Sequence, residues 1–348
     1  MAKKRTQIIL FGKLLLGIAL LVFLVNQIDL RGLTARLYTL DVVYVGIVFV
    51  LPHVGIWLSS VKWQALLNRL GVDVPLRRLL ALYMIGTFFN NFFPTMVGGD
   101  VIKAYQLSRE AGNGSAVVAA TFMERFVGLA ALVSLLPLIL LQDEILDAFP
   151  ILALVVVLAI AGYLVLLFII FSDVPDVRVR LRGQDSTLPM AEKLSGFVQR
   201  TRAQVLFFRR SRVILSAAYL ISIGFYLVTC VTAWAAVSST GAQVDFGYVL
   251  SIVPFILLAA LIPISVNGLG ITESGYVLFL HSASMSMLDA VTIALLIRAR
   301  VLFTAILGGL TFLLYKPALA SIPDPDALLS AMDTPPSNGT PDTPGRRN

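Results

Sequence analysis

The feature that most constrains this chain is a series of long apolar runs. They lie at about 8–28, 42–66, 78–94, 115–141, 150–172, 212–237, 247–264, 270–282 and 288–315. A helix needs about 20 apolar residues to cross the hydrocarbon core of a bilayer, and several of these runs are long enough. Hydrocarbon offers no hydrogen-bond partners, so backbone groups must pair within the chain, and barrel strands would be shorter and would alternate. We therefore predict an all-α integral membrane protein with about eight transmembrane segments.

Composition and charge agree with this class and exclude others. Of the 348 residues, 58% are hydrophobic and 14% are charged, whereas about a quarter of a soluble domain is charged. The net charge is +7, but the cations lie mainly between the apolar runs, where topology and anionic lipids account for them, so nucleic acid is not expected. Cys230 is the single cysteine, and His53 and His281 lie far apart, which argues against a disulfide, a metal site or a cofactor.

The distribution of lysine and arginine predicts the orientation in the membrane, because cytoplasmic loops carry an excess of both. Three regions are assigned to the cytoplasm: the N-terminus with Lys3, Lys4 and Arg5, the segment 62–78 with Lys62, Arg69, Arg77 and Arg78, and the basic loop 173–212. Arg31 and Arg36 run against this trend. The polytopic domain would cover 1–316. Residues 317–348, rich in Pro, Asp, Ser and Thr, would form a disordered cytoplasmic tail because they cannot bury enough apolar surface.

Two further features would place residues at the membrane surface. In the basic loop, Leu194, Phe197, Val198, Val205 and Phe208 fall near one helical face, which is typical of an interfacial amphipathic helix. A plain basic tether explains the same charge equally well, so both interpretations stay open. Aromatic residues near helix ends are typical interfacial anchors, and we interpret Trp57, Trp63 and Trp234 in this way.

Two of the apolar runs end in breaks of the same kind. The first break lies within 78–110 and contains NNFFPTMVGGD, and the second lies within 247–282 and contains LIPISVNGLGITESG. Each combines a proline, which cannot continue a helix, glycines that permit a sharp turn, and a carboxylate where the next helix begins. The residues concerned are Pro94, Gly98, Gly99 and Asp100 in the first break, and Pro263, Asn267, Gly268, Gly270 and Glu273 in the second.

The predicted orientation requires each broken segment to return to the side from which it entered. Residues 78–110 would enter from the cytoplasm and residues 247–282 from outside, so they would form two re-entrant helical hairpins in inverted-topology halves. Inverted halves with interrupted helices are typical of secondary transporters with a site at the membrane midplane. The pattern leaves open whether 100–110 and 270–282 are half-helices or full crossings.

Charged residues also lie within the helices that follow the two breaks. Glu124 and Arg125 follow the first break, and Arg298 and Arg300 follow the second. Each charge at the bilayer centre costs about 2.5–3.5 kcal/mol on insertion scales, so we expect these side chains to pair with the carboxylates of the breaks. Such a mixed set of charges suits a phosphate-bearing or zwitterionic group. The alternative is that the breaks only cap loops and the charges pair for structural reasons.

A family resemblance rests on three segments, FFNNFFPTMVGGDVIKAYQLSR, ERFVGL and PISVNGLGITESGYVLFL. They resemble the flippase-like membrane domain of lysylphosphatidylglycerol synthases, the multiple peptide resistance factors, and the resemblance covers about residues 8–316. It implies a stand-alone protein of the prokaryotic cytoplasmic membrane that moves lipids between leaflets. By position it implies the substrate-binding residues Asn91, Asp100, Lys103, Glu124, Arg125, Asn267 and Glu273, to which the charge pattern adds Arg298 and Arg300. It also implies the helix-break residues Pro94, Gly98, Gly99, Pro263, Gly268 and Gly270.

One departure from the family limits what the resemblance implies. The synthases carry a soluble aminoacyl-transferase domain, whereas a short polar tail follows the last apolar run here. We therefore expect no synthesis of lysylphosphatidylglycerol and no enzymatic activity. The lipid could equally be another phospholipid or a polyprenyl-linked sugar.

The main functional hypothesis is a lipid flippase or scramblase acting through a central polar cavity. Its partners would be membrane phospholipids or a lipid-linked substrate, with a second copy of the chain or a separate lipid-modifying enzyme beside it. No Walker motif is present, so ATP would not drive transport directly; proton coupling through Asp100, Glu124 or Glu273 is a hypothesis. The alternatives are a small-solute secondary transporter, an intramembrane lipid-modifying enzyme with Asp100 as base or Ser265 as nucleophile, and a structural membrane partner.

Overall fold

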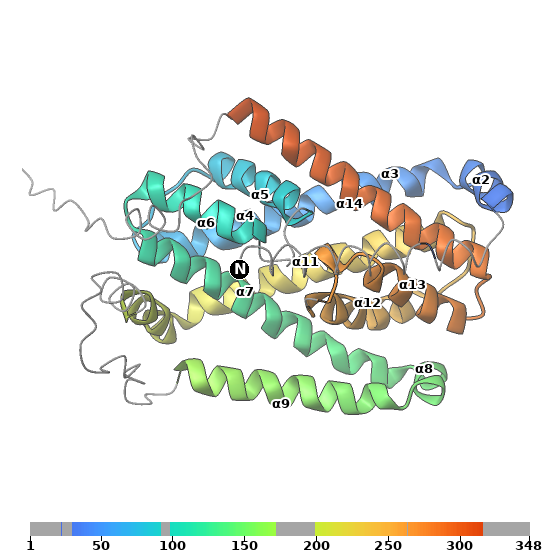
Figure 1. Cartoon of the computed structure of the whole chain (residues 1–348). Helices are drawn as coiled ribbons and strands as arrows, with labels where there is room; N and C mark the ends of the chain where they lie inside the picture. The colour runs from blue at the N-terminus through green and yellow to red at the C-terminus, as the bar shows by residue number, and fades with distance from the viewer. Residues whose placement is uncertain (1–21, 23–29, 92–97, 172–198, 263, 316–348) are drawn as a thin grey trace, which may run out of the picture.

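The computed structural model describes residues 22, 30–91, 98–171, 199–262 and 264–315 (Figure 1). Across these ranges the secondary structure is helical and contains no strand, which confirms the all-α prediction. Several predictions fall outside the described residues. They concern the first apolar run, Pro94, Pro263, most of the basic loop and the tail.

Five helices are long and apolar enough to cross a membrane. They are α3 with α4 (Val42–Val50 and Pro52–Arg69), α7 (Gly114–Leu135) with the 3-10 turn η1 (Leu136–Leu141), α9 (Ile151–Phe171), α11 (Arg212–Ser238) and α14 (Met287–Tyr315). Each begins and ends within a few residues of a predicted run. A multi-pass membrane protein is therefore shown, with five such helices in the described part of the chain.

Four shorter helices make up the two broken segments. They are α5 (Leu76–Asn90), α6 (Gly98–Ala111), α12 (Phe246–Leu261) and α13 (Ile271–Ser282). With 12 to 16 residues each, they extend about 18–24 Å at 1.5 Å per residue, less than the roughly 30 Å of a hydrocarbon core. α5 packs against α6, and α12 packs against α13. The two pairs lie toward opposite ends of the bundle in Figure 1.

Close glycine contacts fix how the first pair of helices packs. A Cβ atom at Gly99 would overlap the carbonyl of Gly86, so only a glycine lets α6 approach α5 this closely. A Cβ atom at Gly308 would likewise meet the carbonyl of Met84, where α14 crosses α5. α14 also packs on α13, so this one helix runs along both broken segments.

Two hydrophobic cores hold these pairs in place. One buries residues of α5, α6 and α7 together with α4, and the other buries residues of α12, α13 and α14 together with η1. Shorter helices complete the described fold: α2 (Leu30–Tyr38), α8 (Asp143–Ala148), a helix over 199–207 and the turn η2 (Phe208–Arg210).

The structure corrects two assignments made from the sequence. Lys62 does not belong to a surface loop, because it lies inside α4 with only 6% of its surface exposed. Trp63 cannot serve as an interfacial anchor, because its side chain is fully buried within the protein. Within the basic loop, Val205 and Phe208 are buried against the core around α4–α7, so this end of the loop packs on the bundle.

Candidate functional site

The two helix breaks meet each other. Asn91 follows the last residue of α5, and Asn267 lies in the 3-10 turn η3 (Val266–Gly268) just before α13. The side-chain amide Nδ2 of Asn267 donates a hydrogen bond of 3.0 Å to Oδ1 of Asn91. This contact joins the two helix-break motifs, whose relative position could not be predicted from the sequence.

The backbone at the second break is sharply bent. Asn267 has a φ of 48°, and Gly268 and Gly270 have φ values of 66° and 80°. Glycine adopts this left-handed region without strain, and asparagine is among the few other residues that tolerate it. Gly268 and Gly270 were predicted to break the helix, and their positive φ values show that the backbone leaves the helical conformation at both residues.

A side chain caps the new helix after each break. The backbone N–H of Gly99 donates to Oδ1 of Asn90 at 2.7 Å, and that of Gly270 donates to Oε2 of Glu273 at 2.7 Å. Asp100 and Glu273 lie in the first turns of α6 and α13. Free N–H groups and the helix dipole favour negative charge at these positions. Part of the role of Glu273 is therefore to cap α13.

The first charge cluster comprises Lys62, Asp100, Lys103, Glu124 and Arg125. Asp100 accepts from Arg125 Nε at 2.5 Å and from Lys103 Nζ at 3.1 Å. Lys103 also contacts Glu124 at 2.9 Å, and Lys62 lies 3.9 Å from the same carboxylate. The pairing expected between Asp100 and an arginine is present. The residues implied on α6 and α7 thus form one network.

Aromatic side chains surround the ammonium of Lys103. Its Nζ lies 3.7 Å from the ring centre of Tyr83 and 4.7 Å from that of Trp63, distances typical of cation–π contacts. The Tyr83 hydroxyl also donates a hydrogen bond to Glu124. Lys62, Trp63 and Tyr83 were not among the residues predicted to form the site. Lys62 could have been suspected as a site residue, because it is a lone cation close to the end of a long apolar run.

The second charge cluster comprises Glu273, Arg298 and Arg300. Glu273 pairs with Nε of Arg298, as expected for the carboxylate of the second break. Arg300 differs from its neighbour. Its Nε atom is shielded from solvent, and no described residue accepts a hydrogen bond from that atom. Among the described residues, Nε of Arg298 therefore has a carboxylate partner, whereas Nε of Arg300 has none.

Exposure also distinguishes the charged residues. Asp100, Lys103, Glu124 and Glu273 are each at most 4% exposed. Arg125, in contrast, has 52% of its side chain exposed, although it lies near the middle of a candidate membrane span. Arg125 is therefore an accessible cation near the middle of a candidate membrane span.

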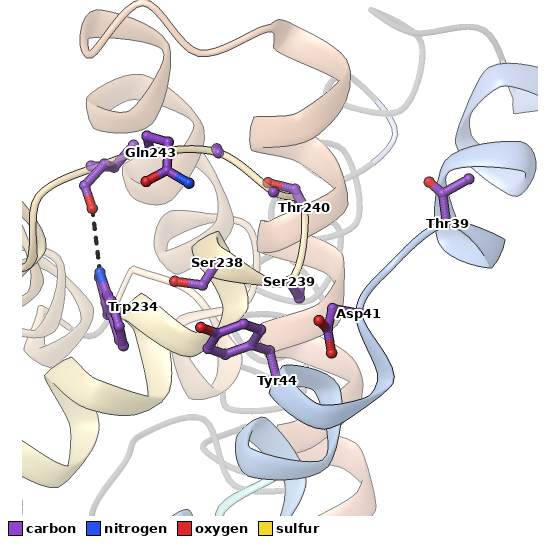
Figure 2. Close-up of a pocket in the computed structure, with 11 residues that line it drawn as sticks. Thr39, Asp41, Tyr44, Trp234, Ser238, Ser239, Thr240 and Gln243 are labelled. Atoms are coloured by element: carbon purple, nitrogen blue, oxygen red, sulfur yellow. Dashed lines mark hydrogen bonds between the residues drawn. The ribbon is translucent and has the colours of Figure 1, made fainter.

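A separate pocket of about 530 Å³ lies where α11 ends and α3 begins (Figure 2). It is lined by Thr39, Asp41, Tyr44, Trp234 and residues of the 238–244 turn. Beside it, Arg36 donates to Asp289 at 2.5 Å and to the Thr240 carbonyl at 2.6 Å, which explains an arginine that opposed the predicted orientation. No member of either charge cluster lines this pocket, so the charged site is a different place.

The predicted site residues thus fall into three groups, in which each described residue except Arg300 has a polar partner within its group. The asparagine contact joins the breaks, the first cluster holds Asp100, Lys103, Glu124 and Arg125, and the second holds Glu273, Arg298 and Arg300. Ser265, considered as a nucleophile, is buried, and its hydroxyl has no hydrogen-bond partner among the described residues. Pro94 and Pro263 lie outside those residues.

Comparison with known proteins agrees with the resemblance seen in the sequence. The chain is 20% identical over 281 residues to a UPF0104 membrane protein of Pyrococcus horikoshii, an alignment that covers 75% of this chain and 83% of that protein. The model of the lysylphosphatidylglycerol synthase TM region matches residues 10–309, which include both helix breaks and both charge clusters. By this match the chain belongs to the family of the lysylphosphatidylglycerol synthase transmembrane region.

Proposed function

We propose that this protein is a flippase or scramblase that moves a charged-headgroup lipid between the leaflets of a prokaryotic cytoplasmic membrane. The observation that carries the proposal is the contact between Asn91 and Asn267, which joins two helix breaks that are each flanked by a buried charge cluster. In this proposal α5–α6 and α12–α13 are re-entrant hairpins that enter from opposite sides. Each hairpin then supplies polar partners for the lipid headgroup over the half of the bilayer that this hairpin occupies.

The physical problem for such a protein is the headgroup. A charged group that enters hydrocarbon without partners loses several kcal/mol or more of solvation free energy. Fixed ion pairs and helix N-termini near half depth replace part of that solvation. Glu124, Arg125, Arg298 and Arg300 all lie near the middle of long helices, where this replacement is needed most.

Arg125 is the residue that we assign to first contact with the headgroup. Its side chain is half exposed, while its Nε remains bound to the buried Asp100. Asp100 therefore orients the guanidinium, and the remaining N–H groups can bind phosphate oxygens. For the headgroup to pass, the hairpins must separate at the Asn91–Asn267 contact, first toward one leaflet and then toward the other.

The test is headgroup translocation in proteoliposomes, measured as dithionite quenching of fluorescent phospholipids. Native protein should extend quenching from the outer leaflet to the inner one, and Arg125→Ala, Asp100→Asn and Glu273→Gln should slow this by at least about tenfold. Arg36→Gln, which changes an ion pair away from both clusters, serves as the matched control and should translocate at the native rate. Equal rates in all four variants would refute the assignment of the site.

A further inference from the structure

The pocket where α11 ends and α3 begins lies apart from both charge clusters and has no role in the proposed transport (Figure 2). Its volume of about 530 Å³ falls within the range of about 300–1,000 Å³ that is typical of small-molecule sites. α11 runs from Arg212, which closely follows Arg209 and Arg210, to Ser238. The pocket therefore lies at the end of α11 opposite these arginines, which is the end that the positive-inside rule assigns to the outer side.

Hydrogen bonds and ring packing hold the wall of the pocket in a defined shape. The backbone N–H of Asp41 donates to the Ser239 carbonyl at 2.9 Å, which joins the start of α3 to the turn after α11. The indole N–H of Trp234 donates to the Val244 carbonyl at 3.3 Å, which orients the ring. Tyr44 packs edge-on against that ring, with the ring centres 6.2 Å apart. The shape of the pocket thus does not depend on a bound ligand.

Polar side chains with unused hydrogen-bonding capacity face the pocket. Figure 2 shows the hydroxyls of Tyr44 and Ser238 turned toward the side where the Trp234 ring lies, with Gln243 on the loop above them in this view. None of these three polar groups has a hydrogen-bond partner among the described residues. A hydroxyl and an amide can each donate and accept, so the pocket offers both kinds of partner to a ligand.

The charges at the pocket argue against an anionic ligand. Among the described residues that line it, Asp41 is the one charged residue. Arg36, which lies beside the pocket, already uses its three nitrogens on Asp289, Thr39 and the Thr240 carbonyl. One oxygen of Asp41 caps the start of α3, which explains this carboxylate without a bound amine. A neutral, hydrogen-bonding ligand fits these charges best.

We propose that this pocket binds a glycosyl group, the hydroxyl-rich part of either a glycolipid headgroup or a free sugar. The hydroxyls of a sugar both donate and accept, so they match Tyr44, Ser238 and Gln243. A sugar also has an apolar face of C–H groups, which packs on an aromatic ring such as that of Trp234. A neutral polyol needs no counter-charge, in agreement with the absence of lysine and arginine from the described lining. The proposal does not depend on whether the protein moves lipids.

The test is a fluorescence titration of the purified full-length protein in a polyoxyethylene detergent, which carries no sugar. The probes are diacylglycerols that bear one glucose, galactose or mannose. At least one of them should change the tryptophan emission in a saturable way, because a sugar on the Trp234 ring alters the surroundings of the indole. Trp234→Phe should abolish this change, whereas Trp57→Phe, which alters an exposed residue of α4, should retain it. Phosphatidylglycerol and phosphatidylethanolamine at the same mole fraction should cause no change that depends on Trp234.

Two milder variants test the polar groups without removing the ring. Tyr44→Phe and Gln243→Ala each remove one hydrogen-bonding group and should weaken glycolipid binding about threefold to tenfold. Gln142→Ala removes the same kind of side chain from a residue that does not line the pocket, so it should bind as native protein does. Native affinity in both Tyr44→Phe and Gln243→Ala would overturn the proposal.

The remaining outcomes separate the class of ligand from its source. No Trp234-dependent change with any of the three glycolipids or their free methyl glycosides would overturn the proposal. A change with phosphatidylethanolamine in place of the glycolipids would also overturn it, in favour of an amine bound by Asp41 and the two rings. Methyl glycosides that bind as tightly as the glycolipids would support a site for a free sugar, whereas binding that requires the lipid chains would support a site for a glycolipid.

Discussion

Asn267 donates a hydrogen bond to Asn91 across 176 residues of sequence, and this bond joins the two broken helices of the protein. The breaks come from parts of the chain with matching order: an apolar helix, a segment that contains proline and glycine, and a helix with a carboxylate in its first turn. Asp100 and Glu273 lie in the first turns of the helices that follow these breaks. The proposed path of the lipid headgroup runs through this contact.

The asparagine contact should be measurable as a coupling energy. Asn91→Ala and Asn267→Gly should each destabilise the protein, and the double variant should be more stable than the sum of the single effects by about 0.5–1.5 kcal/mol. Glycine is chosen at position 267 because it tolerates the positive φ. Unfolding of all four proteins in detergent gives the cycle, and strict additivity would show that the bond contributes nothing.

The close approach of α5 and α6 predicts different effects for two glycine substitutions. Gly99→Ala places a methyl group against the Gly86 carbonyl and should lower the unfolding midpoint by several degrees. Gly46→Ala, on α3, meets nothing within 4 Å and should leave the midpoint unchanged or slightly higher, because alanine favours helix. A tolerated Gly99→Ala would mean that α5 and α6 pack more loosely than the contact between Gly99 and Gly86 indicates.

The two buried lysines of the first cluster should differ in importance. Lys103→Met removes contacts of 2.9 and 3.1 Å to two carboxylates and should cost about 3–5 kcal/mol. Lys62→Met removes a 3.9 Å contact and a hydrogen bond to Ser222, and should cost less. Chemical unfolding of both variants tests the order. The reverse order would mean that Lys62, rather than Lys103, holds Glu124.

The ion pair between Arg36 and Asp289 should contribute little to stability. Both side chains are partly exposed, at 27% and 21%, so solvent and salt weaken the attraction. Arg36→Gln and Asp289→Asn should each cost less than about 1 kcal/mol, and raising the salt concentration should reduce the difference from native protein. A larger effect that persists in high salt would assign Arg36 a structural role through the Thr240 carbonyl.

The sequence predicted the long helices well because their length and apolar character follow directly from the thickness of a bilayer. The run predicted at 115–141 is observed at Gly114–Leu141, and the run at 288–315 at Met287–Tyr315. The breaks were also predictable, since proline, glycine and an acidic residue recur in the same order. The sequence could not predict which of these side chains are in contact. Only the structure shows that Asn91 and Asn267 touch, and that Arg298 rather than Arg300 pairs with Glu273.

Lys62 shows why a charge rule can fail locally. A lysine near the end of an apolar run usually marks a cytoplasmic loop, so Lys62 was assigned to one. The rule uses only the local sequence, so it takes no account of a carboxylate on another helix. Glu124 lies 62 residues further along the chain, and only the packing of α4 against α7 makes it a partner for Lys62. The burial of Trp63 beside Lys103 follows from the same packing.

The most direct test of the account is to lock the two breaks together and measure lipid movement. Asn91→Cys and Asn267→Cys would be combined with Cys230→Ala, and the pair joined by a short reducible cross-linker in proteoliposomes. If headgroups pass between the breaks, cross-linked protein should stop translocation of fluorescent lipid, and reduction should restore it to the rate before cross-linking. Translocation at an unchanged rate in fully cross-linked protein would contradict the claim that the path runs through the Asn91–Asn267 contact.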